Sequence, residues 1–306
     1  MNLSKLDELQ KQVAKLDSIS TAPVVLQPLL ELLRLPAESV LFEKVVELVS
    51  YDGAIAAQCL RLANSPLFGR RTVETVRSAV ITLGIQRVRS VLLGLCMNQT
   101  LPKDKWVIEP VAFWRHSLGC ALVTQRIAQT IGHGEPEKAY LAGLIHDLGI
   151  LVNSLLYTTS FRECFESASE TRRALHVCEE EILGFTHCES GHLLAEQWHM
   201  SAELCEVARA HHNLDVQESP QPLVCLVHLG DLLCRVRYLG HGYNEILRVD
   251  LGGELAWQTL AKTYPELAQM DVARFTMDID GAMDQIVTTV DAVFGPAAAS
   301  PAPPAS

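Results

Sequence analysis

The sequence lacks the marks of a membrane-spanning or secreted protein. No run of about 20 apolar residues is free of polar side chains, and the apolar stretch 140–156 is interrupted by His146, Asp147 and Asn153. The N-terminal segment MNLSKLDELQKQVAKLDSI alternates charge with Leu and Val, without the apolar core and small-residue cleavage site of a secretory signal. We therefore expect no transmembrane helix and a cytoplasmic protein.

Cysteine pairs and positive charge are also scarce. The nine cysteines occur singly, with no Cys-x-x-Cys pair, and most have apolar neighbours, which indicates packed, reduced thiols. Asp and Glu outnumber Lys and Arg by 36 to 25, giving a formal net charge of -11. This charge disfavours nucleic acid and anionic membranes. The expected partners are signalling proteins, or a small ligand such as a nucleotide.

Alternating, strand-like segments are few and short, whereas apolar positions recur at three- and four-residue spacing. The spacing predicts an all-α, multi-helical bundle, and the 48% hydrophobic content suffices for one or two cores. Thr186 and Glu189 fit a capping box at one helix start. The expected helices cover residues 23–33, 54–63, 72–83, 85–95, 111–131, 136–156, 171–183, 188–199, 202–212 and 222–236.

Composition divides the chain into three parts. The segment 101–110 contains two prolines and several charges, and it predicts a boundary between an N-terminal helical half, 1–105, and a C-terminal helical half, 106–295. The last residues, 296–306, are nearly all Ala, Pro and Ser. That composition cannot build a core, so we expect a disordered tail.

Ionisable residues stand at positions expected to be buried. His116 shares a helical face with apolar residues, namely Phe113, Cys120, Val123 and Ile127. The His146-Asp147 pair and Asp231 each lie in an almost wholly apolar run, where an unpaired carboxylate carries a large desolvation cost. Convergence of these residues on a cation would offset that cost, with nitrogen and oxygen ligands suited to one or two ions of Fe, Mn or Zn.

More histidines extend this set. His187 stands at an expected helix start, and His211 and His212 stand at an expected helix end, pointing about 100° apart. The alternative is a hydrogen-bonded His/Asp cluster that holds no metal. Six further histidines follow no such pattern, and we interpret them as surface groups or as groups that support the ligands. They are His133, His176, His192, His199, His228 and His241.

The order His116, His146-Asp147, Asp231 resembles the H…HD…D pattern of the HD superfamily, whose metal-dependent phosphohydrolases use those positions as ligands. His187, His211 and His212 resemble the additional histidines of the two-metal HD-GYP cyclic-di-GMP phosphodiesterases. Over roughly residues 17–236 the chain is similar to the HDOD family. The segments that carry this similarity are YDGAIAAQCLRLANSPLFG, SAVITLGIQRVRSVLL, AYLAGLIHDLG, EEEILGFTHCESGHLLAEQW and HH.

Two departures separate the chain from HD-GYP enzymes. Ile150 stands where their phosphate-contacting lysine is placed, and HHNLDVQESPQP contains no GYP tripeptide. The HDOD resemblance thus implies a regulatory signal-transduction module that acts by binding proteins or a small ligand. The alternative is a metal-dependent phosphohydrolase, acting on a cyclic dinucleotide or nucleotide, in which Asp147 bridges two metals. We assign no catalytic residue, and expect Ile150→Lys to restore phosphate contact without harming the fold.

A basic stretch surrounds two expected helices of the N-terminal half. Two arginines, Arg61 and Arg77, accompany four that we consider candidates for phosphate or partner contact: Arg70, Arg71, Arg87 and Arg89. Arginines on two consecutive helices are also found in helix-turn-helix DNA-binding domains. Apolar residues fill both helices and the chain is acidic, so a nucleic-acid-associated regulator ranks below the other two classes.

Overall fold

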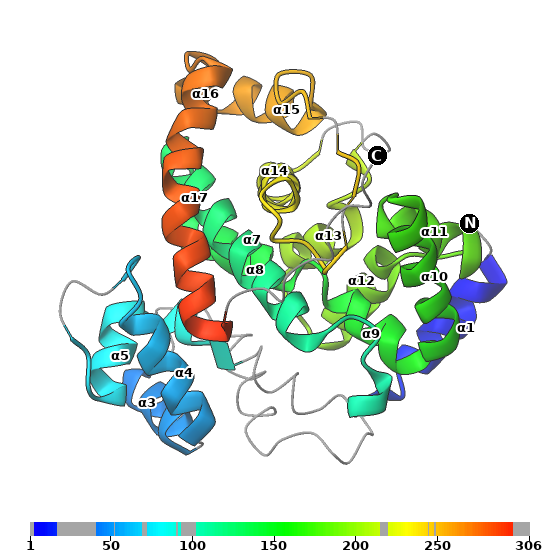
Figure 1. Ribbon diagram of the computed structural model, residues 1–306, viewed down its shortest axis with the longest axis horizontal. Coiled ribbons are helices and arrows are strands. Elements are labelled where there is room, and N and C mark those ends of the chain that lie inside the picture. The colour runs from blue at the N-terminus through cyan, green and yellow to red at the C-terminus, as the bar shows by residue number, and fades with distance from the viewer. Residues whose placement is uncertain are drawn as a thin grey trace, which may run out of the picture.

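The structure is a computed structural model (Figure 1) that describes residues 3–16, 41–51, 53–68, 72–89, 91–92, 102–214, 220–243, 245–247 and 249–295. Within these ranges every regular element is a helix and there is no strand. The predicted all-α class is confirmed. The helix expected over 23–33 and the disordered tail expected over 296–306 lie outside the described residues.

The described helices fall into an N-terminal and a longer C-terminal series. The first series comprises α1 (Leu3–Val13), α3 (Phe42–Tyr51), α4 (Gly53–Ala63), α5 (Val76–Leu83) and the short 3-10 helix η3 (Lys103–Lys105). The second comprises α7 (Pro110–Thr130), α8 (Pro136–Ile145), α9 (Leu148–Leu156), α10 (Thr158–Thr171), α11 (Leu175–Ile182), α12 (His187–Gln197), α13 (Ala202–Ala210), α14 (Pro222–Val236), α15 (Leu255–Thr263), α16 (Pro265–Ala268) and α17 (Val272–Phe294).

Local sequence signals explain where several helices start. Proline occupies the first turn of α7, α8 and α14, where its missing N–H removes no helical hydrogen bond. Before α12, Thr186 and Glu189 form the predicted capping box, in which the Thr186 backbone N–H donates to Glu189 Oε2 at 2.7 Å. This cap fixes His187 as the first residue of α12.

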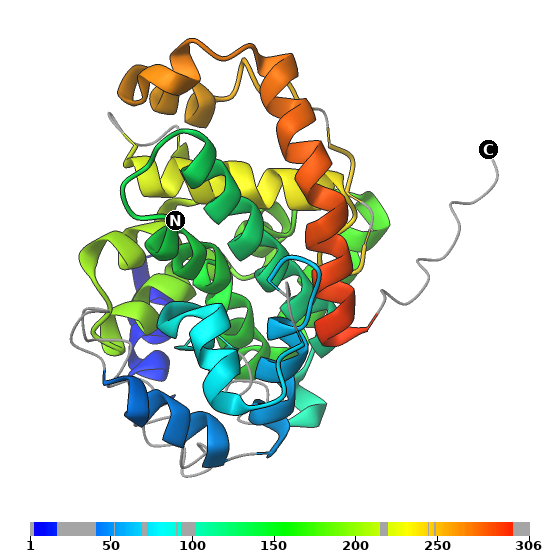
Figure 2. The ribbon, with the colours of Figure 1, turned by 90° about the vertical axis from the view of Figure 1, so that its left-hand side faces the viewer.

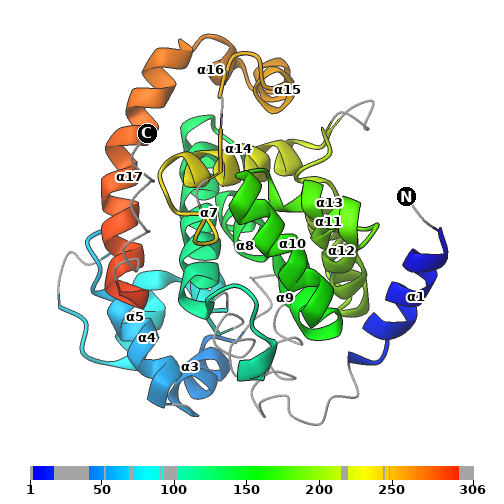
Figure 3. The ribbon, with the colours of Figure 1, turned by 45° about the vertical axis from the view of Figure 1, so that its right-hand side comes forward.

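Helix α7 is the centre of the core. It packs against α8, α14 and α17, as Figures 2 and 3 show from two sides. The inward face predicted for this helix is confirmed, since His116 and the apolar residues assigned to its face are fully buried. Helix α8 approaches closely at Gly143, where an added Cβ would lie 2.8 Å from the Cys120 carbonyl oxygen. That close approach brings His116 and the end of α8 together.

The helix predicted over 136–156 is two helices. Helix α8 ends at Ile145, the backbone leaves helical geometry at Asp147, with φ -98° and ψ 13°, and the chain resumes as α9. The stretch Pro136–Leu156 is long and apolar enough to cross a membrane, but 89% of its apolar window is buried inside the protein. It is therefore a core segment, and the break points two ionisable side chains inward.

Other helix boundaries shift for local reasons. Helix α5 starts later than expected because the Thr75 side chain caps it, accepting from the Ser78 backbone N–H at 3.1 Å. The helix expected over 171–183 starts as α11 at Leu175, because Arg172, with φ 57°, ends α10 in the left-handed region. Helix α14 has the predicted bounds.

The N-terminal helices occupy two places. Helices α3, α4 and α5 pack against one another, and α17 returns from the C-terminal series to pack against both α4 and α7 (Figure 1). Helix α1 lies apart from α3–α5 and packs against α12. The division at residues 105 and 106 stays a prediction.

Candidate metal centre

The fold brings together all seven residues that the sequence pattern singled out as ligands. They come from α7, the break between α8 and α9, the start of α12, the end of α13, and α14. None of the seven side chains is more than 9% exposed. They are His116, His146, Asp147, His187, His211, His212 and Asp231, and we call them the His/Asp cluster.

Asp147 lies at the middle of the His/Asp cluster, with one carboxylate oxygen facing each side. Oδ2 is 3.3 Å from His116 Nε2 and 3.1 Å from His146 Nε2. Oδ1 is 3.3 Å from both His187 Nε2 and His211 Nε2. One carboxylate thus joins two groups of ligand atoms.

The second carboxylate, Asp231, closes one side of the cluster. Its Oδ1 is 3.4 Å from His116 Nε2, and its Oδ2 is 3.8 Å from His212 Nδ1. Arg235, one helical turn later, contacts both oxygens, at 3.1 Å from Nε and 3.0 Å from a terminal nitrogen. Glu245 in turn contacts Arg235 at 2.8 Å. This chain of charges fixes the orientation of the Asp231 carboxylate.

Four histidines share one arrangement, in which Nδ1–H donates to a group outside the cluster and Nε2 points toward Asp147. Three of them donate to backbone carbonyls: His116 to Leu239 at 2.6 Å, His146 to Gly143 at 2.8 Å, and His211 to Val207 at 3.0 Å. The fourth, His187, donates to the Glu179 carboxylate at 2.6 Å. This tautomer leaves each Nε2 lone pair directed inward.

The Nε2 lone pairs of the histidines and the carboxylate oxygens of the two aspartates face one another, and they repel unless a positive charge lies between them. The Nε2 atoms of His116 and His146 are only 3.3 Å apart, and buried Asp147 Oδ1 and His187 Nε2 have no hydrogen-bond partner among the described residues. Burial lowers the pKa of His116, but Asp147 and Asp231 outweigh it and raise that pKa to about 9. Protons can therefore supply the charge, and so can a metal cation. The donor set fits a metal ion, which the cluster could hold.

His241 lies beside the cluster, which agrees with the second of the two roles expected for it, that of a group supporting the ligands. Its Nε2 is 2.8 Å from Asp147 Oδ2, and its ring contacts the His116 ring at 4.3 Å between centroids. It lies beyond the end of α14, in a segment without the helical periodicity that identified His116. Glu179 was missed, because it stands in an acidic run that looks solvent-exposed in sequence.

The other histidines lie around the cluster or away from it. His176 stacks on His212 at 4.4 Å between ring centroids, and His228 Nδ1 donates to the His211 carbonyl at 2.7 Å. These two histidines contact cluster residues, in agreement with their interpretation as groups that support the ligands. His133 contacts Tyr264 at 2.6 Å.

Two of the four candidate arginines can be placed. Arg87 donates to Gln125 at 2.8 Å and to Glu137 at 3.0 Å. Arg89 is buried, with 1% of its surface exposed. Arg87 is partly buried, and phosphate or partner contact stays a prediction at these two positions. Arg70 and Arg71 lie outside the described residues.

The burial of position 150 argues against the expectation that lysine would be tolerated there. Ile150 is only 1% exposed on α9 and belongs to the hydrophobic core. An ammonium group there would be desolvated, and the fold would lose stability.

Comparison with known proteins agrees with this architecture. The HDOD domain model matches residues 19–214. An uncharacterized protein of Treponema pallidum (strain Nichols) is 26% identical over 251 residues, which are 79% of this chain and 48% of the relative. The chain thus spans about half the length of that curated relative.

Three solved structures share the fold. An HDOD domain protein of unknown function from Geobacter sulfurreducens has a TM-score of 0.75 at 24% identity, covering 93% of this chain and 98% of its own. A candidate signal transduction protein from Marinobacter aquaeolei VT8 has a TM-score of 0.69 at 21% identity, covering 95% and 66%. A candidate phosphohydrolase from Shewanella amazonensis SB2B has a TM-score of 0.67 at 21% identity, covering 92% and 97%. With most of its length matched by the family model, the chain belongs to the HDOD family.

Proposed function

We propose that this HDOD protein is a cytoplasmic regulatory module of signal transduction, which acts by binding signalling proteins or a small ligand. Its His/Asp cluster holds one or two ions of Fe, Mn or Zn. The name of the Marinobacter aquaeolei VT8 structure points to the same class of role. The net charge of -11 weighs against nucleic acid and anionic membranes as partners.

Burial of the cluster is the observation that carries this proposal. His116, His146 and His211 are fully buried, and the two aspartates are at most 3% exposed. A phosphodiester substrate has to reach the metal-bound atoms, whereas an ion needs only its ligands. The cluster therefore suits a metal ion held as a fixed part of the core of a binding module better than turnover of a nucleotide. The hydrophobic Ile150, where the related phosphodiesterases place a lysine, favours the same conclusion.

The ligand set divides into two groups around Asp147. His116, His146 and Asp231 would hold one ion, and His187, His211 and His212 would hold a second, with Asp147 contributing to both. A bound transition metal would supply Lewis acidity and a more acidic water. The chain itself supplies the orientation of each imidazole, through the outward hydrogen bonds of Nδ1.

The second candidate function is a metal-dependent phosphohydrolase acting on a cyclic dinucleotide or nucleotide. One observation favours it: the two carboxylate oxygens of Asp147 face different ligand groups, as a bridging ligand of a two-metal site requires. The name of the Shewanella amazonensis SB2B structure points the same way.

Loading the protein with Mn, Fe or Zn and assaying it against cyclic dinucleotides and nucleotides tests the two functions against each other. The proposal predicts bound metal and no turnover. Metal-dependent hydrolysis that is lost in Asp147→Asn would establish the phosphohydrolase instead. Hydrolysis that survives this substitution would indicate a contaminating enzyme, since Asp147 contacts both ligand groups.

A further inference from the structure

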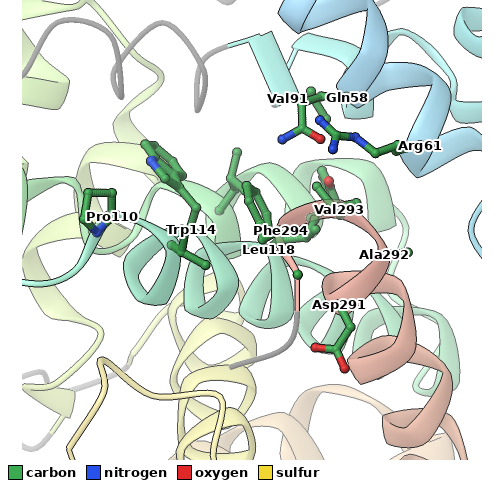
Figure 4. A pocket seen from close by; sticks show the side chains of 14 residues that line it. Gln58, Arg61, Val91, Pro110, Trp114, Leu118, Asp291, Ala292, Val293 and Phe294 are labelled. Carbon is green, nitrogen blue, oxygen red and sulfur yellow. The ribbon is translucent and has the colours of Figure 1, made fainter. Parts of the chain in front are cut away.

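A cavity of about 490 Å³ lies between α4, α7 and the C-terminal end of α17 (Figure 4). None of the seven residues of the His/Asp cluster lines it. Its walls are mostly apolar and include Leu118 of α7, Leu144 of α8 and Phe294 of α17. Clefts of this size and lining are typical of small-molecule sites.

Apart from Asp291, which is paired with Arg115, three polar atoms in the walls have no hydrogen-bond partner among the described residues. They are Trp114 Nε1, Tyr140 Oη and Gln58 Oε1, and each atom is buried. Trp114 is 5% exposed and Tyr140 is fully buried. Buried polar atoms are rarely left unpaired, and a tryptophan N–H can only donate. Trp114 Nε1 and Tyr140 Oη therefore call for a ligand that carries hydrogen-bond acceptors, whereas Gln58 Oε1 is itself an acceptor.

The charges around the cavity favour an anion. Asp291 is paired with Arg115 at 2.6 Å, so its negative charge is already compensated. Arg61 of α4 has no ion-pair partner among the described residues, and its guanidinium lies beside the Gln58 side chain in Figure 4. An acidic group on the ligand would meet this guanidinium at the side of the cavity formed by α4.

We infer that this cavity binds an apolar carboxylic acid. The hydrocarbon part packs against Leu118, Leu144 and Phe294, and the carboxylate pairs with Arg61. The two unpaired donors in the walls, Trp114 Nε1 and Tyr140 Oη, are available to oxygen atoms of the ligand. The inference goes beyond the proposed function and does not depend on whether the His/Asp cluster holds metal.

A ligand in this cavity would touch the helices that carry the cluster. The Trp114 ring contacts Phe113 at 4.8 Å between centroids, and Phe113 stacks on His241 at 6.2 Å. Leu144 of α8 precedes His146 by two residues. The cavity also joins α4 to the C-terminal helices, so occupancy would affect how the two series of helices are held together.

Calorimetric titration of the full chain with decanoate tests the inference, with naphthoate as an aromatic acid and decanol as the uncharged counterpart of decanoate. We expect decanoate or naphthoate to bind with one molecule per chain. Arg61→Gln should weaken binding of the acid about tenfold and leave decanol unchanged. The matched control is Arg274→Gln on α17, a residue that does not line the cavity.

Two further variants separate binding from folding. Tyr140→Phe removes only a hydroxyl that has no partner, so it should weaken acid binding about fivefold without loss of thermal stability. Leu118→Phe fills part of the cavity and should abolish binding. The inference is overturned if neither acid binds, if decanol binds as tightly as decanoate, or if Arg61→Gln and Leu118→Phe bind the acids like the unaltered protein.

Discussion

The Glu179 carboxylate lies 2.6 Å from Nδ1 of His187, and the same oxygen accepts the His187 backbone N–H at 3.0 Å. The other Glu179 oxygen accepts from Asn153 at 3.0 Å. Glu179 is fully buried, so these contacts are shielded from water. One side chain of α11 thus fixes both the start of α12 and the orientation of an imidazole in the His/Asp cluster.

Glu179→Gln should weaken metal binding about 10- to 100-fold, because the imidazole loses the charged acceptor that orients it and raises its basicity. Competition with a fluorescent metal indicator measures this change. Glu181→Gln is the matched control, since Glu181 is exposed and its ion-pair partner among the described residues is Arg173, at 2.7 Å. Equal metal affinity in the two variants would contradict the supporting role of Glu179.

Gly149→Ala should destabilise the protein by about 3 kcal/mol, because an added Cβ on α9 would lie 2.6 Å from the Gly191 backbone nitrogen on α12. Gly281→Ala, in the interior of α17, should instead stabilise it by about 1 kcal/mol, since nothing lies within 4 Å of the added atom. Urea unfolding of the two variants measures both free energies. A neutral Gly149→Ala would show that α9 and α12 are not in close contact.

Ile150→Lys should lower the free energy of unfolding by about 3 kcal/mol, because a hydrophobic side chain in the core would be replaced by an ammonium that loses its hydration on burial. Val177→Lys on α11 provides the control, since Val177 is 38% exposed. Chemical denaturation compares the two lysine variants. If Ile150→Lys were as stable as the control, the side chain at position 150 would have to reach solvent.

Removal of metal should lower thermal stability if the cluster binds an ion. A free ion at about 100 times its Kd stabilises the folded state by about 2.7 kcal/mol, because the unfolded chain does not assemble the ligands. We expect Mn, Fe or Zn to raise Tm, and a chelator to reverse the rise. Asp147→Asn should show neither effect, and a rise that persists in this variant would place the ion elsewhere.

Much of the architecture could be predicted from periodicity. Helix α14 has the bounds that its apolar spacing and Pro222 indicated, and the capping box at Thr186 forms. Apolar spacing placed His116 inward, and it is fully buried. These features depend on residues close together in sequence, for which helical geometry is a sufficient guide.

The remaining features depend on contacts between distant segments. The break at His146-Asp147 lies inside the segment 136–156, whose spacing predicts one continuous helix, and the hydrogen bond from His146 Nδ1 to the Gly143 carbonyl accompanies it. His241 reaches Asp147 from 94 residues away along the chain, in a segment without helical periodicity. Sequence spacing carries no information about such approaches, so the helix break and the contact of His241 with Asp147 could be found only in the folded structure.

The measurement that tests the central claim most directly is elemental analysis of protein purified without chelators or a metal-affinity tag, with Asp147→Asn purified alongside. The account predicts one or two transition-metal ions per chain and their loss in the variant. A folded, metal-free protein that takes up no Fe, Mn or Zn on titration would contradict it and leave a hydrogen-bonded His/Asp cluster held together by protons.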